Sequence, residues 1–163
     1  MRVWKGIDLA AVPAQFDPKP AGRRVLILDA DGPAYRAVTT AKTLPTAMRR
    51  FVQHVLELQF LTNCTEVRLH LTARGSKKAH RKHYPTFWGY QDKRSGPKPP
   101  LLEPLRMAIF DAYERGNGLI PTDWFVDMHH YWEADDGMIM DAVRFGDEAV
   151  IWSEDKDLSL IHI

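Results

Sequence analysis

The sequence is poor in the features that build disulfide-stapled and membrane-spanning proteins. It contains one cysteine, Cys64, so no disulfide can form within the chain. Its apolar runs are all shorter than the ~20 residues that cross a bilayer. The first residues lack the uninterrupted apolar core of a secretory signal peptide. We therefore expect a cytoplasmic protein without a membrane partner, in a reducing compartment.

Net charge is also small, +1, so bulk charge identifies no partner. The length of 163 residues suits one domain, and a hydrophobic fraction of 45% with 26% charged residues is ordinary for a globular protein. The charge is unevenly distributed: residues 74–98 hold eight Lys and Arg against one acid, and residues 122–157 hold eleven Asp and Glu against two bases. This pattern suits a metal enzyme that binds a polyanion, although on charge alone two solvated patches are the simpler interpretation.

Apolar runs alternate with amphipathic segments along the chain. Residues 23–32, 66–72, 123–128 and 148–153 have strand patterns, and residues 44–64, 101–118 and 133–145 have helical spacing. We expect Thr46 to cap the first helix, and Gly116 or Gly118 to end the second. Strands that alternate with helices predict an α/β fold with a mainly parallel sheet flanked by helices on both faces. Residues 1–22, with three prolines, are expected to form an extension of this domain.

Acidic residues follow three of the four predicted strands. They are Asp29 and Asp31 after the first strand, Glu133, Asp135 and Asp136 after the third, and Asp155 and Asp157 after the fourth. Because the carboxyl ends of parallel strands meet at one edge of a sheet, we expect these carboxylates to gather there. Two unit charges about 4 Å apart repel by roughly 4 kcal/mol at an effective dielectric constant near 20, so something should offset that repulsion.

Divalent metal ions are one way to offset it. Mg²⁺ prefers oxygen ligands, and one or two such ions can activate a water and stabilise the leaving oxygen in phosphodiester hydrolysis. Each acidic group also has a structural explanation when it is taken alone, because acids at a helix start cap amides and favour the helix dipole. The group after the fourth strand could equally be a polar turn. Their joint occurrence after three strands favours the metal site.

Three segments resemble the N-terminal acidic motifs of the flap endonuclease and 5′-to-3′ exonuclease family, most closely those of bacteriophage exonucleases. The segments are LILDADGPAYRA, YWEADDGMIMDA and VIWSEDKDL. The resemblance implies a PIN-like catalytic domain over residues 23–157, in the host cytoplasm if the gene belongs to a phage. It implies hydrolysis of nucleic-acid phosphodiesters from or near a 5′ end, with one or two Mg²⁺ or Mn²⁺ ions. The implied catalytic and metal-binding residues are Asp31, Glu133, Asp135, Asp136, Asp155 and Asp157.

The resemblance also implies a basic, arch-like loop over residues 73–100 that admits a single-stranded 5′ end. The residues expected to bind nucleic acid are Tyr35, Arg36, Lys77, Lys78, Arg81, Lys82, Lys93 and Arg94. Tyr84, Phe87, Trp88 and Tyr90 could stack on splayed bases or return to the core. Tyr35 and Arg36 could equally begin a helix. The expected partner is DNA, with RNA or an RNA–DNA hybrid as alternatives, and the expected state is a monomer.

The sequence departs from the family pattern in two places. Many relatives carry a further metal-binding Asp just after the second strand, where this chain has Thr72 and Ala73. Relatives often have a Lys and an Arg in the basic loop at positions where this chain has Trp88 and Gln91. Asp29 has no certain counterpart in the family.

Two other functions remain open. The segment LDADG resembles the nucleophile motif of haloacid-dehalogenase-type phosphatases, in which Asp29 would attack phosphorus and Asp31 would act as acid and base. That family usually has Thr or Val where this chain has Pro33. The chain could instead be a nucleic-acid-binding fragment with an incomplete metal site. His129 and His130 should face opposite ways, and with no cysteine nearby we expect no zinc site there.

Relatives continue past the third acidic motif with more sheet, a DNA-binding element and further metal-binding Asp residues. We therefore expect the natural gene to continue, and this chain to lack a C-terminal DNA-binding domain. Residues 158–163, LSLIHI, resemble the translation of a transposase adapter used in preparing sequencing libraries, so we expect them to be wholly or partly foreign. Without the ligands of a second metal ion, the chain is expected to be a weak or inactive nuclease.

Overall fold

A computed structural model of the chain describes residues 3–4, 7–8, 22–83, 85 and 97–154. The elements after the amino-terminal segment are β3 (Val25–Asp29), α1 (Asp31–Thr39), α2 (Leu44–Thr62), β4 (Glu66–Thr72), η1 (Lys78–His83), α3 (Leu102–Arg115), β5 (Trp124–His129), α4 (Ala134–Phe145), η2 (Gly146–Glu148) and β6 (Ala149–Trp152). Two short antiparallel strands, β1 (Val3–Trp4) and β2 (Ile7–Asp8), precede them. None of the described helices is both long and apolar enough to cross a membrane.

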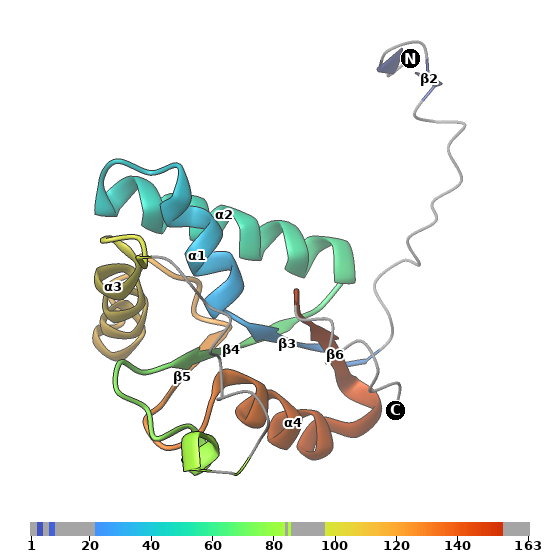
Figure 1. The fold of residues 1–163 in the computed structure, drawn as a ribbon. Helices are drawn as coiled ribbons and strands as arrows, with labels where there is room; N and C mark the ends of the chain where they lie inside the picture. Colours follow the sequence, from blue (N-terminus) through green and yellow to red (C-terminus); the bar gives the residue numbers. More distant parts are fainter. Residues whose placement is uncertain (1–2, 5–6, 9–21, 84, 86–96, 155–163) are drawn as a thin grey trace.

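Strands β3 to β6 form one parallel sheet in the order β5–β4–β3–β6. Helices α1, α2 and α3 cover one face, and α4 covers the other (Figure 1). The chain crosses the sheet from β3 through β4 to β5 and then returns to the opposite edge at β6. Since crossovers between parallel strands are right-handed, this reversal places α4 on the other face. The predicted α/β fold is confirmed, and the arrangement is consistent with a PIN-like domain.

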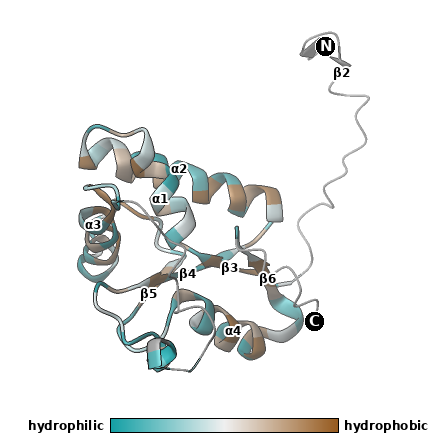
Figure 2. Cartoon of the chain, viewed as in Figure 1, coloured by the Kyte–Doolittle hydropathy of each residue, from teal (hydrophilic) through white to brown (hydrophobic). Residues whose placement is uncertain are grey.

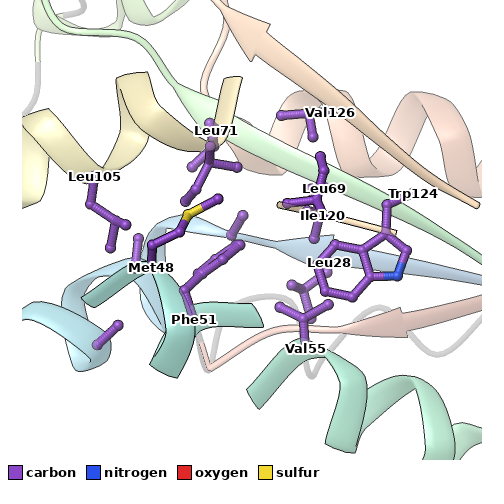
Figure 3. Packing of buried hydrophobic residues seen from close by; sticks show 14 of the residues in the cluster. Leu28, Met48, Phe51, Val55, Leu69, Leu71, Leu105, Ile120, Trp124 and Val126 are labelled. Carbon is purple, nitrogen blue, oxygen red and sulfur yellow. The ribbon is translucent and has the colours of Figure 1, made fainter. Parts of the chain in front are cut away.

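The larger core lies between the sheet and helices α1, α2 and α3 (Figure 3). Alternate residues of β4 point into it, so Leu69 and Leu71 are fully buried in the same cluster as Phe51 of α2. Trp124 of β5 is buried too, and its indole N–H donates to Gln59 of α2 over 2.9 Å, which satisfies its one polar atom. Helix α2 alternates hydrophobic and hydrophilic residues along its length, as Figure 2 shows. One face of the helix therefore packs while the other meets water.

A smaller apolar cluster lies between α4 and the sheet. Val25 and Ile27 of β3 pack there against Met138 and Ala142 of α4. The α4 face of β4 and β5 is largely polar instead, because side chains alternate along a strand and the positions between the buried apolar residues are mostly charged or histidine. Helix α4 therefore covers an apolar half and a polar half of the same face.

The predicted elements are confirmed, with differences at their ends. The N-cap of α2 is Thr43, whose hydroxyl accepts the amide of Thr46 over 3.4 Å, so the prediction that Thr46 caps this helix is wrong. Gly116 ends α3 in a left-handed conformation, as predicted. Tyr35 and Arg36 lie on α1, the helical alternative of the two that the sequence allows.

Candidate functional site

The acids of the first two motifs lie where the sheet's strands end. Asp31 is the first residue of α1, just after β3, and its amide donates to Asp29 Oδ1 over 3.0 Å. Glu133 is the N-cap of α4, which follows β5, and Asp135 and Asp136 lie in the first turn of that helix. Both segments leave the same edge of the sheet because all four strands run in parallel.

Asp136 and Glu133 also cap helix α4. The Oδ2 atom of Asp136 accepts the amide of Glu133 over 3.1 Å, in the arrangement of a capping box. The structural explanation is therefore correct for both residues. It does not explain why the carboxylate of Glu133 is buried, since burying a charge is costly unless a partner compensates it.

Basic side chains provide that compensation. Arg81 donates to Glu133 Oε2 and to Asp136 Oδ1, each over 2.5 Å. Lys78 Nζ lies 3.1 Å from the other oxygen of Glu133. Arg106 of α3, a residue that the sequence analysis did not single out, lies 2.9 Å from Asp31 Oδ1. These cations offset the repulsion among the carboxylates.

Thr72, at the end of β4, joins the two acidic segments. Its amide donates to both carboxylate oxygens of Asp31, over 3.3 and 3.4 Å. Its hydroxyl accepts the amide of Ala134, the first residue of α4, over 3.0 Å. A neutral residue at the end of β4 therefore positions both segments without adding a further negative charge.

The third acidic motif is described only at its start. Glu154 lies just after β6 and pairs with Arg36 of α1. Its side chain also lies beside Gly32, so this motif approaches the first one at the carboxyl edge. Asp155 and Asp157 lie outside the described residues, and their assignment as metal ligands stays a prediction.

The described start of the basic loop is anchored beside the acidic cluster. The amides of Lys77 and Ala79 and the hydroxyl of Ser76 donate to backbone carbonyls of residues 130–132. Residues 78–80 all have left-handed φ angles, between 49° and 59°. Such backbone costs about 1 kcal/mol or more per non-glycine residue, and persists where surrounding contacts hold it, often at functional sites.

The loop's predicted binding residues are only partly described. Lys77 is exposed, and its Nζ lies 5.9 Å from the centre of the Tyr131 ring. Lys82 lies within η1. Lys93, Arg94, Tyr84, Phe87, Trp88 and Tyr90 lie outside the described residues. Tyr131 and Trp132, which the sequence analysis did not assign to binding, are exposed beside the acids at 40% and 42%.

A second polar group lies under α4, next to the carboxyl edge. His70 of β4, Asp127 of β5 and Asp141 of α4 bring possible ligand atoms within 4.8 Å of one another, which no other trio does in the described part of the chain. None of the predicted metal-binding carboxylates belongs to this trio. No sequence motif marks this group, and only the alternation of side chains along β4 and β5 places His70 and Asp127 on the same face of the sheet.

His70, a member of this group, stacks on a second histidine, His129. His70 is 2% exposed, and its Nδ1 lies 2.9 Å from Nε2 of His129. Burial, together with the charge of His129, lowers the pKa of His70 to about 4, although Asp141 and Asp127 act in the opposite direction. Burial also lowers the pKa of His129. Both rings are therefore neutral at neutral pH.

The free energy of unfolding is expected to fall as the pH drops from about 6.5 towards about 4. The pKa of His70 is lower in the folded chain, so the unfolded chain takes up the proton first and stability is lost in this window. A shift of this size corresponds to on the order of 3 kcal/mol for His70. Urea unfolding in EDTA at several pH values measures it. A flat profile between about pH 6.5 and 5 would contradict the prediction.

The chain matches no protein-family model, and comparison with curated proteins and with solved structures finds no significant match.

Proposed function

We propose that this chain is a divalent-metal-dependent nuclease domain that hydrolyses nucleic-acid phosphodiesters from or near a 5′ end. The observation that carries the proposal is the meeting of acids and bases at the carboxyl edge of the parallel sheet. Asp31 and Glu133 follow separate strands. Arg106 forms an ion pair with Asp31, and Arg81 forms one with Glu133. In parallel α/β sheets this edge is where ligands bind.

The number of charges at this edge favours a binding role over a purely structural one. Buried ion pairs contribute little net stability, because desolvation offsets most of their attraction. Apolar side chains could hold α4 and the loop as well or better. Glu133 and Arg81 are instead placed where substrate chemistry is expected, beside the strained backbone of residues 78–80. The arrangement fits a site in which these charges bind a ligand.

Carboxylate oxygens suit hard divalent cations, so Asp31, Glu133 and Asp136 are the described residues that would hold them. In this structure their oxygens do not all lie within 4.8 Å of one another, so binding an ion would require these side chains to move closer together. When bound, one or two Mg²⁺ or Mn²⁺ ions supply water activation and charge stabilisation for phosphodiester hydrolysis. Arg81 and Lys78, which now neutralise Glu133, would then have their charge available for substrate phosphates. Thr72 keeps both acidic segments in place.

Exposed aromatic residues at the same edge suit single-stranded nucleic acid. Tyr131 and Trp132 lie directly before Glu133, and Lys77 is near the Tyr131 ring. Stacking of bases on aromatic rings contributes about 1–3 kcal/mol per base and tolerates any sequence. We therefore favour single-stranded DNA as the first substrate to test, with RNA as the second.

The purified chain is expected to shorten 5′-labelled single-stranded DNA slowly in Mg²⁺ or Mn²⁺ and not at all in EDTA, because the ligands of a second metal ion are expected to be missing. Gel electrophoresis of 5′- and 3′-labelled strands separates exonuclease products from endonuclease products, and a flap substrate tests for structure selectivity. DNA binding without cleavage in either metal would contradict the proposal and favour a non-catalytic binding domain. Hydrolysis of a phosphate monoester that Asp29→Asn abolishes would instead favour the phosphatase alternative.

A further inference from the structure

The side chains of the trio under α4 are arranged as in a metal site, and none of them belongs to the proposed nuclease centre. Its three side chains come from three elements, β4, β5 and α4, so a bound ion would tie the helix to the sheet. In Figure 1 this helix lies on the face opposite α1, α2 and α3. Asp141 lies about 12 Å along the helix axis from Glu133, given the 1.5 Å rise per residue.

Two buried polar atoms of the trio face each other without a well-formed hydrogen bond. Nε2 of His70 and Oδ2 of Asp141 lie 3.3 Å apart, at ion-pair distance but with poor alignment for a hydrogen bond, and neither has another hydrogen-bond partner. Unsatisfied buried polar atoms are rare in folded proteins and call for an explanation. The separation matches that between two ligands of a tetrahedral zinc ion, which is about 3.3–3.5 Å for bonds of about 2.0–2.1 Å.

The contact between the two histidines makes Nε2 of His70 available as a metal ligand. Since Nδ1 of His70 lies 2.9 Å from Nε2 of His129, a proton on His70 Nδ1 can be donated to His129. Nε2 of His70 then carries its lone pair towards Asp141. Histidine ligands commonly donate their second ring N–H in this way, which fixes the tautomer and the ring orientation. Helix α4 holds the rings in place from above through the close approach of Gly137.

Asp127 completes the trio from the edge strand. Its side chain is exposed, so rotation can close the remaining gap and solvent can reach the site. We propose that His70, Asp127 and Asp141 bind a first-row divalent transition metal, Zn²⁺ in the first instance, with a water completing the shell. One imidazole and two carboxylates suit Zn²⁺, whereas Mg²⁺ prefers oxygen ligands alone. The ion would stabilise the packing of α4.

The test measures Zn²⁺ binding to the EDTA-treated full chain by calorimetry, and Co²⁺ binding by its visible absorption. We expect one Zn²⁺ per chain, a rise in melting temperature with Zn²⁺ concentration, and no displacement by excess Mg²⁺. Asp127→Asn and Asp141→Asn should each weaken Zn²⁺ binding by at least about tenfold. Because Asp127 is exposed, its variant should fold even if the Asp141 variant does not. Asp147→Asn, an exposed acid of η2, is the matched control and should bind as the unchanged chain does.

Glu133→Gln separates this site from the proposed nuclease centre, because it removes a carboxylate from the sheet's edge only. Zn²⁺ binding that survives Glu133→Gln and fails in Asp127→Asn supports the proposal. Zn²⁺ binding lost in Glu133→Gln and kept in Asp127→Asn would place the ion at the carboxyl edge and overturn it. An absence of Zn²⁺ binding by the folded chain would also overturn it, while leaving the Mg²⁺-dependent nuclease proposal untouched.

Discussion

Replacing Gly137 with Ala is expected to destabilise the fold by about 3 kcal/mol or more, although Ala normally stabilises a helix interior by about 1 kcal/mol relative to Gly. A Cβ atom at this position would lie 2.2 Å from Nε2 of His129 and 2.6 Å from Nδ1 of His70. Neither ring can easily withdraw, because His70 is buried in the sheet and its Nδ1 already lies against His129. Overpacking of this kind costs about 1–3 kcal/mol and more where backbone must move.

Chemical denaturation of the single variant measures this loss. The double variant Gly137→Ala with His129→Ala is the informative control, because His129 supplies the two closest atoms. It should recover stability relative to Gly137→Ala, despite the loss of the His129 side chain. Val143→Ala, at an exposed position of the same helix, should change stability little. A Gly137→Ala chain as stable as the original would mean that α4 does not pack onto the histidine pair.

Replacing Glu133 with Gln is expected to lower metal-dependent DNA cleavage by at least about 100-fold, or about 2.7 kcal/mol in activation free energy. Gln has the same shape and retains an oxygen acceptor, so the change removes mainly the charge. That charge pairs with Arg81 and Lys78, and in the proposed mechanism it holds a metal ion. The loss in the free energy of unfolding should be smaller than the loss in activation free energy, at most about 2 kcal/mol. Arg81 retains its ion pair with Asp136 and is partly exposed to solvent.

Cleavage rates and unfolding free energies of the same preparations separate the two effects. Glu148→Gln is a suitable control, because Glu148 is an exposed acid of η2, just before the amino end of β6 and away from the proposed site. It should cleave as the unchanged chain does. Cleavage that Glu133→Gln leaves intact, in a chain that does cleave, would remove Glu133 from the proposed metal site.

The strands and helices could be predicted from local pattern because each depends on neighbouring residues. The buried run before Asp29 and the alternation in residues 66–72 both form strands of the parallel sheet. The parallel topology follows from the alternation of strands with helices, and it also places Asp31 and Glu133 at one edge. The ends of helices are harder to predict from the sequence, as the start of α2 shows. Thr43 and Thr46 carry the same side chain, and only the backbone conformation decides which of them caps the helix.

The sequence by itself determined the fold class and the edge at which the first two acidic motifs meet, since hydrophobic periodicity and the alternation of strands with helices depend on nearby residues. Only the tertiary structure decided which cations face these acids. Arg106 and Arg81 reach Asp31 and Glu133 from distant segments, and no local pattern specifies such pairs. The trio under α4 depends on the same kind of information. Its atoms meet because the helix crosses two neighbouring strands in one particular register, and that register is set by packing across the whole sheet.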